Sequence, residues 1–174
     1  MPRYEQAIVM TPAVSQPALL SLRPADAEDE AFLRRLFAET QDQLALLRPN
    51  AALWNALVDV QYRGRKMTYG ESYPTAEDAI LYRGSEPLGR LFLHREPGCL
   101  RILDIAVLIE CRGQGIGSWA LRQCQKRAAE AGLRVELSVN PTSPARLLYE
   151  RLGFRATEED AMHVAMAWDA TAAL

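Results

Sequence analysis

A short glycine-rich segment, Arg112–Gly117, constrains the fold of this 174-residue chain more than any other feature. It follows the apolar run Ile102–Ile109 and precedes an amphipathic stretch, Ser118–Ala131, so a strand, a tight turn and a helix are predicted in that order. Glycines in the turn remove side chains that would block a ligand, and the first amides of a helix have no partner within it. Such amides, with the positive end of the helix dipole, favour an anion. The segment therefore predicts a cradle for a phosphate-bearing ligand.

Other phosphate-binding motifs fit the segment less well. A P-loop ends in Gly-Lys-Ser or Gly-Lys-Thr and spaces its glycines further apart, and this chain has neither feature. A dinucleotide fingerprint places G-x-G-x-x-G directly after its strand, whereas here Ser118 replaces the third glycine and residues 110–112 intervene. Glu136 does lie where the ribose-binding acid of that fingerprint would. A further alternative is that the glycines only turn the chain. A turn accounts for one glycine, but it accounts less well for three glycines at alternate positions.

Two sequence blocks together resemble a known superfamily. The pattern R-x-x-G-x-G at Arg112–Gly117, after "LDIAVL" and before a helix, resembles motif A of the GNAT superfamily of N-acetyltransferases, which bind acetyl-coenzyme A. The run Pro144–Phe154, "PARLLYERLGF", resembles motif B of the same superfamily, in which a helix carries a tyrosine shortly before Gly-Phe. The blocks lie in family order and cover residues 100–155, while the N-terminal hundred residues match more loosely. The resemblance implies an acetyl-CoA-dependent N-acetyltransferase.

Apolar periodicity predicts one mixed α/β domain, a central mixed sheet flanked by helices in the order β-α-α-β-β-β-α-β-α-β-β, which is the order of the GNAT fold. Residues 1–17 are predicted to be a lead-in or edge segment, and residues 18–174 a single GNAT acetyltransferase domain. The predicted strands cover residues 18–23, 79–83, 88–95, 100–108, 135–139, 154–157 and 162–168. The predicted helices cover residues 27–40, 51–66, 115–131 and 143–152, with a tyrosine-rich loop over residues 68–75.

Composition narrows the class of function. A net charge of -2 with scattered arginines gives no pull toward nucleic acid. No apolar run approaches the ~20 residues needed to span a bilayer, and the N-terminus lacks a basic segment followed by an unbroken apolar core. We therefore expect a soluble cytoplasmic protein without a nucleic-acid or membrane partner. Three cysteines without C-x-x-C spacing and two distant histidines predict neither a disulfide framework nor a metal site.

The resemblance implies that coenzyme A lies along the cradle and the strand before it. Its pyrophosphate would contact amides of residues 112–118, and its pantetheine arm would pair with residues 105–107 as an added strand, which makes an amide near Val107 a candidate oxyanion donor. Some family branches have asparagine before Pro-Ala; here Ser143 stands there, either as a helix cap or as a coenzyme contact, and Asn140 can substitute. The candidate coenzyme-binding residues are Ile105, Ala106, Val107, Arg112, Gly113, Gln114, Gly115, Ile116, Gly117, Ser118, Asn140 and Ser143.

Two residues are candidates for proton transfer. Tyr149 matches the tyrosine that GNAT enzymes commonly use as a general acid, and a phenol with a pKa near 10 stays protonated at pH 7. The alternative is a core tyrosine on the apolar face of its helix. Asp104 is a carboxylate in an otherwise apolar strand and is a candidate general base. Its alternative is a structural partner for an arginine or for backbone amides, and a strand bulge decides where it points.

The acceptor is expected to bind under the first two helices and the loop after them, where Gln61, Tyr69 and Tyr73 are candidate pocket residues. The same aromatic rings can instead pack the loop down. We expect direct transfer to a primary amine of a small molecule or peptide N-terminus in a ternary complex, without a covalent enzyme intermediate. The rival hypothesis is a non-catalytic coenzyme A binding or sensing module. Homodimerisation through the C-terminal hairpin around Trp168, common in the family, is an open alternative to a monomer.

Overall fold

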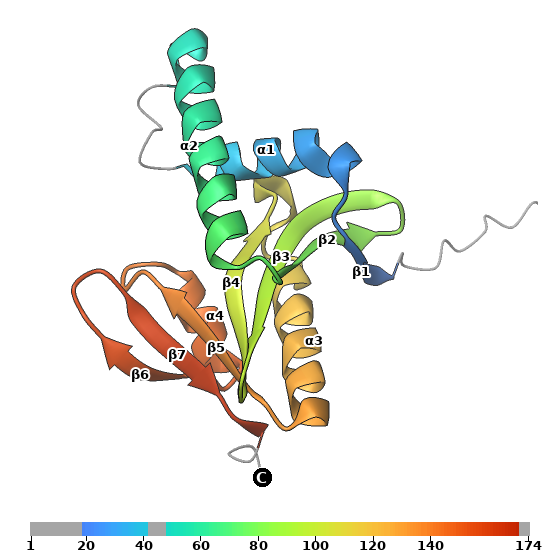
Figure 1. The fold of residues 1–174 in the computed structure, drawn as a ribbon, viewed down its shortest axis with the longest axis vertical. Helices are drawn as coiled ribbons and strands as arrows, with labels where there is room; N and C mark the ends of the chain where they lie inside the picture. The colour runs from blue at the N-terminus through green and yellow to red at the C-terminus, as the bar shows by residue number, and fades with distance from the viewer. Residues whose placement is uncertain (1–18, 42–47, 171–174) are drawn as a thin grey trace, which may run out of the picture.

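The computed structural model describes residues 19–41 and 48–170, and over these ranges it confirms the predicted mixed α/β fold (Figure 1). The segment predicted for residues 1–17 lies outside the described residues. Among the described residues, every helix is too short or too polar to span a bilayer. The elements in chain order are β1 (Leu20–Pro24), η1 (Ala27–Asp29), α1 (Glu30–Glu39), α2 (Ala51–Ser72), β2 (Glu77–Arg83), β3 (Glu86–Glu96), β4 (Cys99–Val107), η3 (Ile109–Cys111), α3 (Ile116–Ala131), β5 (Arg134–Val139), α4 (Ala145–Arg151), β6 (Arg155–Glu159) and β7 (Val164–Trp168).

The described strands form one seven-stranded sheet in the order β1-β2-β3-β4-β5-β7-β6. Every neighbouring pair is antiparallel except β4 and β5, which are parallel. That parallel pairing joins Cys99–Ile102 only to Arg134–Leu137, although β4 continues to Val107. Figure 1 shows the two strands diverging beyond this point. The second half of β4 therefore has an edge that no described strand covers.

A bulge in β4 sets the direction of its side chains. Phe92 of β3 is opposite Asp104, and the next residue, Leu93, is opposite Ile102, so Leu103 is the extra residue. On β3, the ring of Phe92 stacks on Tyr69 of α2, while Leu93 packs in the core with residues of α3. Because neighbouring strand residues point to opposite faces, α2 and α3 cover opposite faces of the sheet.

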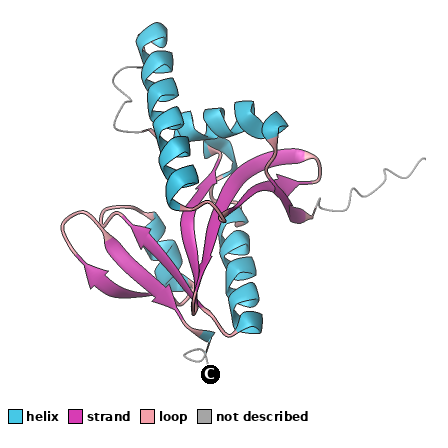
Figure 2. Cartoon of the chain, viewed as in Figure 1, coloured by secondary structure: helices cyan, strands magenta, loops and turns pink. Residues whose placement is uncertain are grey.

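Helix α2 is longer than predicted: residues 68–72 of the predicted loop are helical, and only residues 73–75 lie in a loop as predicted (Figure 2). The helix continues to Ser72 because Tyr69 has a packing partner: its ring lies 5.2 Å from that of Phe92, at an interplanar angle of 14°. Gly70 alone does not end a helix whose neighbours pack well. Pro74 limits the helix, since the residue before a proline is disfavoured in the helical conformation.

The other helices begin and end close to the predicted positions. Asp26 caps the first turn and Asp29 completes a capping box, and the predicted first helix is split there into η1 and α1. Helix α3 ends as predicted at Gly132, whose φ of 65° is left-handed. Its apolar stripe is buried in the core against the sheet, as the fully or nearly fully buried Leu121, Cys124 and Ala128 show.

Candidate functional site

A cleft of about 1450 Å³ lies between helices α1 and α2, the second half of β4, and the start of α4. Residues from five separate segments of the chain line this cleft. The cleft is therefore formed by the tertiary fold and not by a single sequence motif. The cleft reaches the cradle at Arg112 and Gly113. Of the candidate site residues, those that line it are Gln61, Tyr69, Tyr73, Asp104, Ile105, Ala106, Val107, Arg112, Gly113 and Ser143.

The cradle presents a run of unpartnered backbone amides. Within the described part of the chain, the N–H groups of residues 113–118 have no hydrogen-bond acceptor, and the first helical bond of α3 is Trp119 N–H to Gly115 O at 2.9 Å. Gly113 and Gly115 have φ values of 74° and 79°, which a residue with a Cβ rarely adopts. No acidic side chain stands in the first turn of α3, so the dipole of the helix is not countered there. This geometry suits an anionic ligand such as a pyrophosphate.

The second half of β4 has free hydrogen-bonding groups at its open edge. Leu108 N–H donates to Leu88 O at 2.9 Å, so the even-numbered residues of this stretch bond to β3. The N–H and C=O groups of Ile105 and Val107 therefore face away from β3, toward the gap that β5 leaves. Of these groups, Val107 O accepts from Arg112 Nε at 3.1 Å, and the two N–H groups and Ile105 O have no partner among the described residues. An extended ligand arm can pair with this edge as a further strand would.

The side chain of Gln114 in the cradle is bonded within the protein at both of its polar atoms. Gln114 Nε2 donates to Glu110 O at 3.0 Å, and Arg83 Nη2 donates to Gln114 Oε1 at 2.9 Å. Ile116 is buried and holds the start of α3 in the core. A Cβ added to Gly117 would lie 3.6 Å from Leu148 Cδ2, so α3 packs closely against α4 at Gly117. Gln114, Gly115, Ile116, Gly117 and Ser118 offer backbone groups to the cradle but do not line the cleft.

Tyr149 is nearly buried, with 7% of its surface exposed, and lies in the core beside Phe154 at a ring distance of 5.9 Å. It does not line the main cleft, although Leu148 beside it does. Within the described residues its hydroxyl makes no hydrogen bond. Burial, with a smaller effect from the negative charge of Asp104, raises the pKa of Tyr149 to about 12. The phenol is therefore protonated at neutral pH and available as a proton or hydrogen-bond donor.

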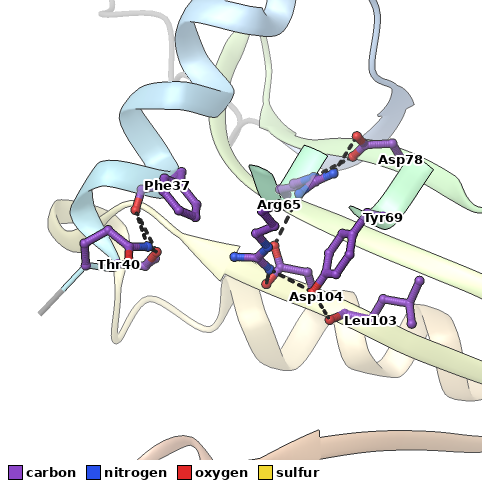
Figure 3. A network of polar contacts seen from close by, with 9 residues as sticks. Phe37, Thr40, Arg65, Tyr69, Asp78, Leu103 and Asp104 are labelled. Carbon is purple, nitrogen blue, oxygen red and sulfur yellow. Dashed lines mark hydrogen bonds and ion pairs between the residues drawn. The ribbon is translucent and has the colours of Figure 1, made fainter. Parts of the chain in front are cut away.

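Asp104 points into the cleft and is held by two arginines (Figure 3). Its Oδ1 lies 2.9 Å from Arg65 Nη2, and its Oδ2 lies 3.5 Å from Arg90 Nη1. Arg90 in turn donates to both oxygens of Asp78 at 2.7 Å. The four groups carry two positive and two negative charges, so this wall of the cleft is polar but has no net charge.

Aromatic rings surround Arg65, which lies on α2. The centre of its guanidinium is 5.0 Å from the ring of Tyr69 and 5.7 Å from the ring of Phe37. Its Nη2 also donates to the Tyr69 hydroxyl at 3.3 Å, and that hydroxyl donates to Leu103 O at 3.5 Å. Over the described ranges its Nε and Nη1 groups have no hydrogen-bond partner. These donors remain for a ligand in the cleft.

The candidate acceptor residues lie together on one wall. Tyr69 packs edge-on against Tyr73 at 6.2 Å, and Tyr73 lies 5.1 Å from the ring of His94. Gln61 is exposed at the same cleft, one turn of α2 before Arg65. The rings of Tyr69 and Tyr73 pack against Phe92 and His94 and also line the cleft.

Ser143 and Asn140 shape the turn before α4. A helix capped by Ser143 would begin at Pro144, but α4 begins one residue later, and Pro144 is its N-cap residue. Ser143 Oγ nevertheless accepts a hydrogen bond from Ala145 N–H at 3.3 Å. Asn140 Oδ1 accepts from Thr142 N–H at 2.9 Å and from Thr142 Oγ1 at 2.7 Å. Ser143 lines the cleft, while Asn140 is exposed outside it.

Sequence reasoning missed Arg65, Arg90, Asp78 and Phe92 as parts of this site. The signal for Arg90 was present, since a charged residue within the apolar strand "LGRLFL" raises the same question as Asp104 does. A pair of opposite charges on neighbouring strands predicts mutual pairing. Arg65 carried no such signal, because arginine on an amphipathic helix is ordinarily a solvated side chain.

Residues 48–154 match the model of the Acetyltransferase (GNAT) family. Among solved structures, PaiA N-acetyltransferase from Thermoplasma acidophilum in complex with coenzyme A has a TM-score of 0.67 at 16% identity, over 87% of this chain and 99% of that one. An acetyltransferase from Thermus thermophilus has a TM-score of 0.66 at 21% identity, over 88% and 99%. The ribosomal-protein-S18-alanine N-acetyltransferase from Escherichia coli has a TM-score of 0.62 at 13% identity, over 87% and 94%. No curated protein sequence matches the chain significantly.

Proposed function

The chain belongs to the GNAT acetyltransferase family, and from this premise we propose that it transfers an acetyl group from acetyl-CoA directly to a primary amine of a small molecule or a peptide N-terminus. The observation that carries the proposal is the continuity of three features: the amide cradle at residues 113–118, the open edge of β4, and the cleft under α1 and α2. One donor and one acceptor can thus meet in a single ternary complex.

The donor would occupy the first two of these features. Amides of residues 113–118 fit a pyrophosphate, with Arg112 at the rim as an additional cation. The open edge at Ile105 and Val107 fits the amide groups of a pantetheine arm, which would bond there as a strand does. Support for the donor also comes from the coenzyme A bound in the Thermoplasma acidophilum structure.

Chemistry would take place where the open edge meets the cleft. The amine nitrogen attacks the thioester carbonyl carbon, so a C–N bond forms, the C–S bond breaks, the amine loses a proton and the leaving thiolate gains one. Holding both reactants together supplies a large part of the rate enhancement. A backbone N–H of the open edge, at Ile105 or Val107, would stabilise the developing oxyanion. Tyr149 would donate to the thiolate, since its hydroxyl has no partner among the described residues and it follows the cleft-lining Leu148.

Asp104 is the proposed destination of the amine proton. Each of its oxygens accepts from one arginine, and a carboxylate oxygen has two lone pairs, so acceptor capacity is left for an ammonium group or a bridging water. Its position one residue before the open edge brings it close to the reacting nitrogen. The bulge at Leu103 is what directs this side chain into the cleft.

The acceptor would lie against Gln61, Tyr69, Tyr73 and Arg65. The charged wall has no net charge, which argues against a polycationic acceptor. The free donors of Arg65 fit a carbonyl or carboxylate oxygen close to the amine, as an amino acid or a peptide N-terminus has. Tyr69 and Tyr73 fit an apolar or aromatic part of the same molecule.

The test is a screen of the purified chain with acetyl-CoA and a library of amines, amino acids and short peptides, read by thiol release and by the mass gain of the product. We expect turnover with at least one amine-bearing compound and none without an amine. The rival, a non-catalytic coenzyme A binding module, predicts saturable binding of acetyl-CoA in calorimetry with no acetylated product from any compound. Absence of both binding and turnover would exclude both functions.

A further inference from the structure

Helix α2 has two apolar faces, and the described part of the domain covers only one of them. On the inner face Val58 is fully buried, and Tyr62 and Tyr69 lie 5.5 Å and 5.2 Å from the rings of Phe37 and Phe92. On the outer face, 43% of Leu53, 69% of Val60 and 65% of Met67 are exposed. Figure 1 shows the N-terminal part of the helix projecting past α1, away from the sheet. The proposed function does not use this outer face.

The exposed residues form a continuous stripe. Leu53, Val60 and Met67 recur every seven residues, and between them stand the small exposed residues Ala56 and Gly64. This set, here called the outer stripe, has successive spacings of three, four, four and three residues, so its members share one face of the helix. Of the eight large apolar side chains exposed among the described residues, three belong to it, so the exposure is concentrated and not scattered. A concentrated apolar patch on a soluble domain marks an interaction surface.

We propose that the outer stripe is the contact of a homodimer in which two α2 helices pack antiparallel about a two-fold axis at Val60. The order of side chains along the stripe is symmetrical by size about this residue. In the antiparallel arrangement Val60 meets its own copy, Leu53 lies opposite Met67, and Ala56 lies opposite Gly64. Large residues thus face large ones, and small residues face small ones and allow the helices to approach closely. Such self-complementarity is the requirement of a two-fold interface.

Charge complementarity at the ends supports the same occupant. The antiparallel arrangement places Arg48, before the start of α2, beside Glu71 of the second copy near its end. In the described parts of the chain neither residue has an ion-pair partner, and Arg48 instead lies over the ring of Trp54 at 5.3 Å. Each pair would join opposite charges, and the two helix dipoles would also run in opposed directions. A second copy of this chain therefore fits the stripe in both shape and charge.

Sedimentation velocity over a wide concentration range tests the proposal. One helix pair gives an interface at the small end of the range, so we expect a dimer with a Kd on the order of 10 μM. Val60→Glu places two carboxylates face to face at the axis and should weaken the dimer at least about 30-fold. Ala51→Glu, at an exposed position on the opposite side of the same helix, should leave it unchanged. A wild-type chain that stays monomeric at the highest concentration, or equal effects of the two variants, would overturn the proposal.

Cross-linking tests the geometry independently of those variants. The native cysteines Cys99, Cys111 and Cys124 are buried, so a new surface cysteine is the accessible thiol among the described residues. With a short bis-maleimide, Val60→Cys should give a covalent dimer and Ala51→Cys should not. Cross-linking at Ala51→Cys alone would contradict the two-fold axis at Val60. If Val60→Glu failed to fold, as circular dichroism would show, this result decides the proposal by itself.

Discussion

At the scale of single residues, Tyr149 offers a direct test of the proposed chemistry. Tyr149→Phe keeps the ring in its core position beside Phe154 and removes only the hydroxyl. Loss of a general acid should lower kcat on the order of 100-fold, with the KM for acetyl-CoA changed by no more than about twofold. Steady-state kinetics with the best acceptor measures both quantities. A kcat that is unchanged for every acceptor would remove the acid role.

The pH profile carries a second signature of the same residue. Because burial raises the pKa of Tyr149 to about 12, its phenol remains protonated throughout the range in which the protein is assayed. An acid with an ordinary pKa would produce a falling limb near pH 10. We therefore expect kcat of the wild-type chain to show no decline at alkaline pH beyond the decline that Tyr149→Phe also shows.

Arg65 is the residue at which acceptor recognition can be separated from chemistry. Arg65→Gln removes the charge that faces the cleft, so the KM for an amino acid or peptide acceptor should rise roughly 10-fold or more, while the KM for acetyl-CoA stays constant. The preference for an amino acid over the amine that lacks its carboxylate should disappear in the variant. Arg63→Gln, on the exposed side of the same helix, is the matched control. Equal losses for both kinds of acceptor would point to a packing role of Arg65 beside Tyr69.

How far the sequence predicts the site differs between these residues. The cradle and Tyr149 sit in two local motifs whose residues are neighbours in the chain, so their grouping needs no knowledge of tertiary structure. Arg65, Asp78 and Arg90 come from three elements that only the folded sheet brings to Asp104. The sequence gives Arg65 an ordinary solvent-exposed interpretation and marks Arg90 only as a charge within an apolar strand, and the pairing that keeps these groups in place is a long-range contact.

At the scale of elements, the turn before α3 depends on backbone conformation more than on space. A Cβ at Gly115 would meet no atom within 4 Å, so the constraint is its φ of 79°. Gly115→Ala should cost roughly 1 kcal/mol of stability and raise the KM for acetyl-CoA up to about 10-fold, because the amides of the turn shift. Gly98→Ala, in the turn between β3 and β4 with φ of 76°, should lose similar stability without a change in KM. A KM that rises equally in both variants would count against the cradle.

The elements themselves are predicted by the sequence better than their ends. The strands alternate clearly enough to be placed within a few residues, and Gly132 marks the end of α3 directly. The sequence misplaces the end of α2 because Gly70 and the tyrosines are typical of loops, whereas the ring of Tyr69 gains a stacked partner only once β3 lies beneath it. The sequence leaves a bulge near Asp104 open but does not place it at Leu103, since no turn residue marks that position.

At the scale of the whole molecule, buried thiols and phenols predict a loss of stability at alkaline pH. Burial raises the pKa of Cys99 to about 11 and those of Cys124, Tyr62 and Tyr149 to about 12. Their ordinary values are 9.0 for the thiols and 10.0 for the phenols. When folding raises the pKa of an acidic group, the free energy of unfolding is unaffected at pH values below the pKa of the unfolded chain. It falls as pH rises from that value toward the pKa of the folded chain.

The free energy of unfolding should therefore be nearly constant up to pH about 9 and then fall. Cys124 alone would contribute on the order of 4 kcal/mol at most. Denaturant melts at a series of pH values measure this slope. Cys124→Ala should melt earlier at pH 7 but with a shallower decline above pH 9, and an unaltered decline would mean that the thiol is not responsible.

The bulge in β4 has a consequence for how the two substrates are kept in register. One strand serves the donor through its backbone edge at Ile105 and Val107 and the acceptor through a side chain at Asp104. If Leu103 paired with Phe92 without a bulge, Asp104 would lie opposite Leu91, whose side chain is in the core, so the carboxylate would leave the cleft. A single inserted residue thus acts as a spacer that fixes the offset between two binding sites. Insertions and deletions in this one strand should be far less tolerable than in any loop that borders the cleft.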